Sequence, residues 1–203
     1  MAHRGTEFLA FYRWALFPLS GGSGTTVGGG SSLAGSTFSS VQDKGFQAGA
    51  YLRNDEPTEI IARLWTSGSI PRKTEYEIGD LNLVTGAADG SECPDRFEDE
   101  TSLFYAGPRG LVVISGCAHS GLVNTVQWGL EVTGASRLAG WIGGTHLGPV
   151  SKEQQDKTLA KLVSFAPDFV AANHCTGFAM MATLHDRFGE RFIPAFVSTV
   201  IDV

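Results

Sequence analysis

The second half of the chain alternates between short hydrophobic runs and segments with helical periodicity. Each run has four or five apolar residues, which is typical of a buried strand. Each is followed by a segment in which apolar residues recur every three or four positions, the spacing of an amphipathic helix. Strands are predicted at 111–114, 138–142 and 169–172, and helices at 122–132, 152–165 and 178–188.

The predicted helices have recognisable ends. The first stops at Gly134 and the third at Gly189, and the second ends before Pro167. Ser151 precedes the second helix, with Gln154 three residues later, which is the spacing of a capping box. The apolar face of this helix is expected to bury Leu159, Leu162 and Val163.

Two further strands complete the pattern. Residues 103–105, a turn at 107–110 and the run 111–114 predict a β-hairpin. A last apolar run at 196–203 predicts a closing strand. The order β-α-β-α-β-α-β indicates an α/β layer structure.

The first half of the chain is less regular. Residues 20–40 are rich in Gly, Ser and Thr, and no Gly-Lys-Ser/Thr sequence follows, so a flexible segment is favoured over a phosphate-binding loop. Residues 51–100 indicate an antiparallel, loop-rich region with strand-like pieces at 59–65. We therefore expect a loosely ordered segment at 1–40 and one domain at 41–203.

Composition limits the functional classes. With 42% hydrophobic and 18% charged residues the chain is an ordinary globular protein, and a net charge of -6 gives no reason to expect nucleic acid or an anionic membrane as partner. Three cysteines indicate neither a disulfide framework nor a zinc knuckle, which favours a cytoplasmic location. The apolar stretch 8–19 contains Arg13 and is too short to span a membrane. A signal peptide within 1–35 is the alternative.

Three histidines follow the three predicted strands. His119, His146 and His174 each lie in a loop of small residues just beyond an apolar run. Because the ends of parallel strands meet at one edge of a sheet, we expect the imidazoles to gather there. Three neutral imidazoles suit a zinc or other first-row metal site with an open position for water. The alternative for each is an ordinary hydrogen-bonded histidine, which is the interpretation we favour for His185 on the third helix.

Polar neighbours of these loops have two interpretations. Cys175 is a candidate ligand or nucleophile, but Cys117 and Cys175 are more simply small residues packed under tight loops. Asp99 and Glu100 could supply a carboxylate, although an acidic surface loop is the simpler interpretation.

Several ordered motifs resemble a known family. They are TSGSIPR at 66–72, DETSL at 99–103, GLVVISGCAHSGLVNT at 110–125, IGGTHL at 142–147 and HCTG at 174–177. In this order they resemble the metallo-β-lactamase-fold hydrolases similar to the 7,8-dihydropterin-6-methyl-4-(β-D-ribofuranosyl)aminobenzene-5'-phosphate synthase group. The resemblance covers about 64–203, roughly two thirds of the chain.

The resemblance implies an αββα sandwich with a metal site, commonly two zinc ions, at one edge of the sheets. His119 and His174 match family metal ligands, and His146 matches a family histidine that is either a ligand or a substrate contact. Arg72, Asn124 and Thr176 match positions that bind substrate or support the site. The implied activity is hydrolysis of a phosphate ester or pterin-related small molecule through a metal-activated water; no catalytic residue is assigned, and homo-oligomerisation is left open.

The chain departs from the family in one respect. Members carry a His-x-His-x-Asp-His cluster near the start of the fold, and this sequence contains none. Three explanations remain: a fold incomplete at its N-terminus through fragmentation or a shifted reading frame, a degenerate member acting as a binding or scaffold protein, or a reduced metal site. A complete two-metal hydrolase is the version that the sequence disfavours.

Overall fold

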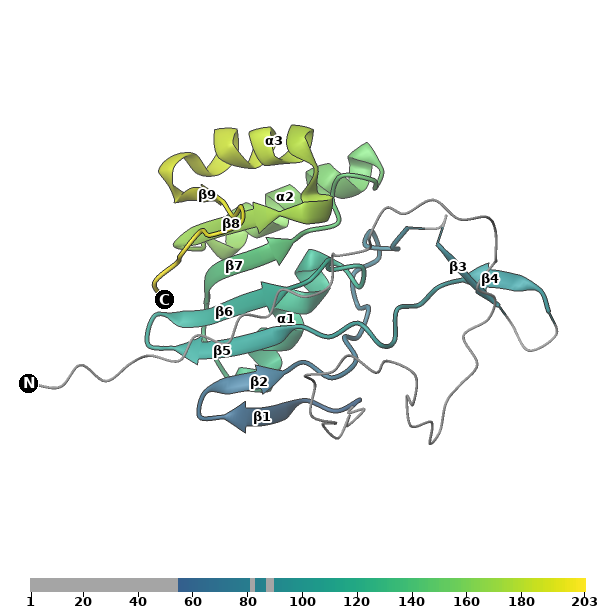
Figure 1. Cartoon of the computed structure of the whole chain (residues 1–203), viewed down its shortest axis with the longest axis horizontal. Helices are drawn as coiled ribbons and strands as arrows, with labels where there is room; N and C mark the ends of the chain where they lie inside the picture. Colours follow the sequence, from purple (N-terminus) through teal and green to yellow (C-terminus); the bar gives the residue numbers. More distant parts are fainter. Residues whose placement is uncertain (1–54, 81–82, 87–89) are drawn as a thin grey trace, which may run out of the picture. The chain divides into compact units, whose positions relative to one another are not determined.

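A computed structural model describes residues 55–80, 83–86 and 90–203 of the chain (Figure 1). The predicted flexible segment at 1–40 lies outside the described residues. In the described part no helix has both the length and the hydrophobicity needed to cross a membrane.

The described residues form a seven-stranded mixed sheet with the order β1-β2-β5-β6-β7-β8-β9 (Figure 1). Neighbouring strands from β1 to β6 are antiparallel, and β6, β7, β8 and β9 are parallel. The strands are β1 Thr58–Ile61, β2 Leu64–Thr66, β5 Leu103–Gly107, β6 Gly110–Ser115, β7 Leu138–Gly144, β8 Phe169–Asn173 and β9 Phe192–Pro194. A separate hairpin pairs β3, Val84–Gly86, with β4, Glu92–Pro94.

The strands predicted at 111–114, 138–142 and 169–172, the hairpin that ends in the first of them and the three predicted helices are confirmed. The helices are α1 Leu122–Thr133, α2 Lys152–Phe165 and α3 Phe178–Phe188, with one-turn helices η1 His174–Thr176 and η2 Gly189–Arg191. The Ser151 side chain accepts a hydrogen bond from the Gln154 N–H, as the capping box predicts. Gly134 ends α1 in a left-handed conformation that suits glycine.

Side chains of the parallel strands alternate between two apolar layers. Leu111, Val113 and Val170 pack with residues of all three α-helices in the main core, whereas Val112 and Ala171 belong to a cluster on the opposite face. Alternation of this kind follows from the two-residue repeat of a strand. The three helices therefore cover one face of the sheet, which confirms the predicted α/β class.

Two predictions of detail are wrong. Val163 is not buried with Leu159 and Leu162; it is 45% exposed on the outer side of α2. The closing strand is Phe192–Pro194, and not 196–203, where Phe196 is 67% exposed. The reason is that β8 turns into η1 at His174, so its ladder with β9 ends at Pro194 and is followed only by the hydrogen bond from the Ala195 N–H to the Ala172 carbonyl oxygen.

A buried carboxylate fixes the start of α1. Gly121 precedes the helix and offers no capping side chain, and Glu77, only 1% exposed, supplies the cap from a distant loop. Its oxygens accept hydrogen bonds from the N–H groups of Val123 and Asn124, both at 2.9 Å, and from the Thr158 hydroxyl at 3.2 Å. Burial raises the pKa of Glu77, and the hydrogen bonds from the helix terminus oppose that shift.

We expect Glu77→Ala to lower the free energy of unfolding by about 2 to 4 kcal/mol, because it leaves buried N–H groups of α1 without an acceptor. Urea unfolding followed by circular dichroism measures the effect. Glu131→Ala is the matched control, since within the described residues Glu131 forms an exposed ion pair with Lys73, and its removal leaves stability nearly unchanged. Equal effects of the two substitutions would contradict the capping role.

Candidate metal centre

Three loops meet at the edge where the parallel strands β6, β7 and β8 end (Figure 1). They carry His119, His146 and His174, as predicted from the sequence. The rings of His119 and His146 are in contact, with centroids 4.3 Å apart. His174 instead contacts Cys117, with its Nε2 atom 3.1 Å from the sulfur. The histidines therefore share one edge but divide between two adjacent groups.

The loops have an unusual backbone. Ala118, His146 and His174 have φ angles of 62°, 47° and 53°, in the left-handed region that residues with a side chain seldom adopt. Each such residue costs about 1 to 3 kcal/mol unless its surroundings compensate, and such residues cluster at functional sites. This clustering of left-handed residues supports a functional role for the edge.

His119 is held in one orientation by Glu100 and Phe97. Its Nδ1 lies 3.2 Å from Glu100 Oε1, and its ring stacks on Phe97 at a centroid distance of 4.3 Å. Glu100 also accepts hydrogen bonds from the backbone N–H groups of His119 and Ser120, at 2.7 Å and 2.6 Å. With Nδ1 committed to the carboxylate, Nε2 is the ring nitrogen available to a ligand.

These contacts shift the pKa values of both His119 and Glu100. The hydrogen bond to Glu100 raises the pKa of His119. Burial alone would raise the pKa of Glu100, but the hydrogen bonds from His119 and Ser120 outweigh it and hold that pKa below its usual value. Glu100 is thus no surface residue: its side chain is 9% exposed, whereas Asp99 is exposed as expected.

His146 is the unusual member of the site. Its side chain is 10% exposed, and within the described part of the chain neither ring nitrogen has a hydrogen-bond partner. The nearest carboxylate oxygen, on Asp80, is 3.9 Å from Nε2. Burial lowers the pKa of His146, which favours the neutral imidazole that binds metals. Buried polar atoms without partners are rare, and a ligand would satisfy them.

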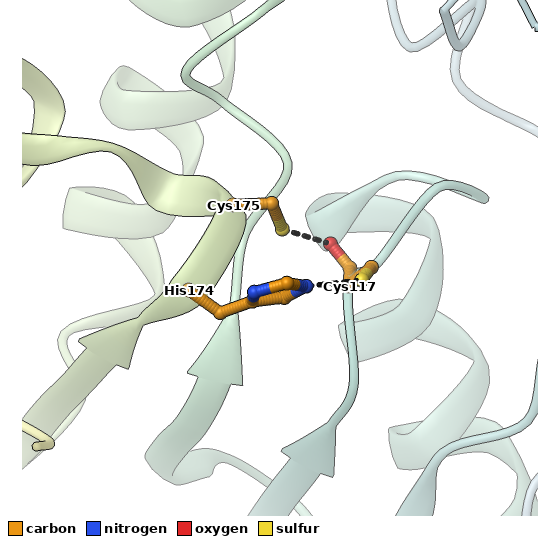
Figure 2. Close-up of side chains that lie close together, drawn as sticks. All are labelled: Cys117, His174 and Cys175. Carbon is orange, nitrogen blue, oxygen red and sulfur yellow. Dashed lines mark hydrogen bonds between the residues drawn. The ribbon is translucent and has the colours of Figure 1, made fainter. Parts of the chain in front are cut away.

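Two cysteines join His174 at the other side of the edge (Figure 2). Cys175 Sγ donates a hydrogen bond to the carbonyl oxygen of Cys117 at 3.4 Å. A side-chain hydrogen bond from the Cys175 thiol to the Cys117 sulfur, with the nearby His174 and His119 charges, lowers the pKa of Cys117 to about 6. The same interaction and burial raise the pKa of Cys175. Interpreting the two cysteines as simple packing residues does not predict this grouping. The signal in the sequence was that each cysteine lies within two residues of a predicted ligand histidine.

The predicted substrate-binding residues differ in their surroundings. The Arg72 guanidinium is partly exposed and donates a hydrogen bond to the carbonyl oxygen of His119 at 2.9 Å. The buried Asn124 amide accepts from the N–H groups of Lys73 and Thr74 and donates to Ser120. Buried Thr176 contacts the hydroxyl of Thr145 at 3.1 Å. These contacts favour the supporting role for Asn124 and Thr176 and leave Arg72 as the candidate for substrate contact.

The donor types at this edge fit a transition metal. Imidazole nitrogen and thiolate sulfur are ligands of zinc and related ions, and a carboxylate that orients a ligating histidine is a common partner. His119 with Glu100 has that arrangement, and the unpartnered nitrogens of His146 lie beside it.

Comparisons with known proteins agree with the α/β fold. No family model matches the chain. Two relatives from Methanocaldococcus jannaschii are the uncharacterized protein MJ0448, 31% identical over 73% of this chain, and a 7,8-dihydropterin-6-methyl-4-(β-D-ribofuranosyl)-aminobenzene-5'-phosphate synthase, 27% identical over 71%. The matches cover 53% and 50% of these proteins, so the chain spans about half the length of the curated relatives it matches.

A solved structure is also similar. It is that of Tm1679, a metal-dependent hydrolase of the β-lactamase superfamily, with a TM-score of 0.56 and 25% identity. The similarity covers 76% of this chain and 57% of the solved chain.

We expect Cys117 to react with iodoacetamide at neutral pH in the metal-stripped full chain, because a pKa of about 6 makes it mainly a thiolate there. The alkylation rate, followed by mass spectrometry of the labelled peptide, should reach half of its maximum near pH 6. The same peptide in urea-unfolded protein is the control and should titrate near the ordinary cysteine value of about 8.5. An identical pH profile in folded and unfolded protein would contradict the assignment.

Proposed function

The chain has the metallo-β-lactamase fold and is similar to the dihydropterin phosphate synthase group, and from this premise we propose that it is a metal-dependent hydrolase. The proposed centre holds metal through His119, His146 and His174. The observation that carries the proposal is His146, a buried neutral imidazole whose two nitrogens have no partner within the described residues. A bound metal ion would supply the partner that this side chain lacks.

His119 supports the same centre. The hydrogen bond between Nδ1 and Glu100 fixes the ring, so that its Nε2 lone pair is the one offered to a metal. Contact between the His119 and His146 rings keeps two nitrogen ligands on one side of the edge. Glu100 is therefore a positioning residue and not itself proposed as a ligand.

The metal ion, with zinc as the proposed species, would supply Lewis-acid chemistry by polarising the scissile bond and lowering the pKa of a water molecule. The chain supplies orientation. Arg72, anchored on the carbonyl oxygen of His119, has further N–H groups for an anionic substrate, because a guanidinium carries five donors. The arrangement favours a phosphate ester, which includes a pterin-related phosphate such as the name of the synthase relative suggests.

A second candidate function is binding without catalysis. The specific observation in its favour is the absence of a His-x-His-x-Asp-His cluster from a sequence with only five histidines. Such a protein would retain the fold and weak metal binding, but it would hydrolyse nothing.

We expect the purified full chain to bind at most one zinc ion and to hydrolyse p-nitrophenyl phosphate or its diester in a metal-dependent way. His146→Ala should lower this rate more than about 10-fold and leave the unfolding temperature unchanged or higher, because it removes unpartnered polar atoms. His185→Ala, at an exposed position of α3, is the control. If no metal tested supports hydrolysis, the alternative of a binding protein without catalysis is correct. Two tightly bound ions per chain would contradict the proposal of a reduced metal site.

We expect Glu100→Gln to weaken zinc binding about 10- to 100-fold, since the amide cannot hold His119 as the carboxylate does. Competition with a chromogenic chelator measures the affinity. Asp99→Asn is the matched control, because this neighbouring carboxylate is exposed. Equal affinities of the two variants would remove Glu100 from the site.

A further inference from the structure

We propose that Cys117, Cys175 and His174 form a binding site for one thiophilic metal ion, with zinc as the physiological class and cadmium as its probe. The site shares His174 with the proposed hydrolytic centre, so an ion bound at one site excludes an ion at the other. Its two sulfur ligands lie outside that centre, and the inference does not require hydrolysis.

The three ligand atoms are already close together. The two sulfur atoms and a ring nitrogen of His174 all lie within 4.8 Å of one another, and the His174 Nε2 to Cys117 Sγ distance is 3.1 Å (Figure 2). Tetrahedral zinc with ordinary Zn–S and Zn–N bonds separates such ligands by about 3.5 to 3.8 Å. Small side-chain rotations therefore suffice to surround an ion.

The backbone brings these residues together from distant parts of the sequence. Cys117 follows β6, and Cys175 lies in η1 directly after β8, with β7 between the two strands. Gly144 at the end of β7 leaves the space that Cys175 occupies: a Cβ at this position would lie 2.7 Å from the sulfur and 2.5 Å from the Gly116 carbonyl oxygen. The Gly144 N–H donates to that same carbonyl at 3.0 Å, which fixes the loop carrying Cys117.

The cysteines are not accounted for as core residues. Among the described residues, the two apolar clusters of the sheet include Ala118 and Ala172 but neither Cys117 nor Cys175. Both thiols are only partly buried, and His174 is exposed, so an ion could enter from solvent. Two sulfur ligands and one imidazole leave a fourth position for water or substrate, as in catalytic Cys₂His zinc sites.

The donor set also indicates which metals are preferred. Thiolates select soft and borderline ions such as zinc and cadmium over magnesium and calcium, which prefer oxygen ligands. Each thiol that coordinates the ion releases its proton to solvent, and no electron transfer is involved.

The experiment is a cadmium titration of the reduced, metal-stripped full chain. Thiolate-to-cadmium charge transfer absorbs in the ultraviolet, and we expect it to saturate at one ion per chain. Cys117→Ser and Cys175→Ser should each weaken cadmium binding more than about 100-fold. This loss exceeds the one expected for a residue that only orients a metal ligand. The double variant should lose the absorption band. Cys93→Ser is the matched control, because Cys93 lies in the β3–β4 hairpin and contacts Thr85.

The outcomes separate this site from the proposed function. Absence of the band in the unmodified chain, or its persistence in a double variant with an unchanged circular dichroism spectrum, would overturn the sulfur site. Loss of the band in Cys93→Ser would show that Cys93 is a cadmium ligand, and this result would also overturn the site. His146→Ala should keep the band while losing hydrolysis. If the unmodified chain gives the band but hydrolyses nothing, the proposed hydrolase is wrong and the sulfur site stands.

Discussion

The parallel register of β6, β7 and β8 is the constraint on which the site depends. Ser115, Gly143 and Ala172 lie in one row across these strands. His119, His146 and His174 follow that row by four, three and two residues, so short loops cannot carry them far from one edge. Gly143 permits this close register, since a Cβ there would lie 1.9 Å from the Ser115 carbonyl oxygen. A slip of one residue would move every following side chain to the other face.

Two carboxylates from the preceding loops position α1 and His119 at the edge where the parallel strands end. Glu77 fixes the first turn of α1, and Glu100 holds both the backbone and the ring of His119. Asn124 ties the same helix to the backbone of Lys73 and Thr74. These contacts link the region before β5 to the edge of the parallel strands, so the position of His119 depends on residues far from it in sequence.

The edge combines features that oppose stability. His146 is buried without hydrogen bonds from the described residues, and both His146 and His174 have left-handed backbones. Strain and unsatisfied groups persist where the surrounding structure holds them, and here the strands β7 and β8, which lead directly to these residues, do so. Metal binding would offset part of this cost, because an ion that binds only the folded state stabilises it.

The sequence by itself determined the order of strands and helices, the capping box at Ser151 and the edge on which three histidines lie. These features follow from local periodicity and from the rule that parallel strands end together. It did not determine that Glu100 is buried against His119, that Cys117 and Cys175 meet, or that the last strand ends at Pro194. Only the tertiary structure decided these points, because burial, pairing and ligand grouping depend on which distant segments the fold places in contact, and one sequence read along its length contains no such distances.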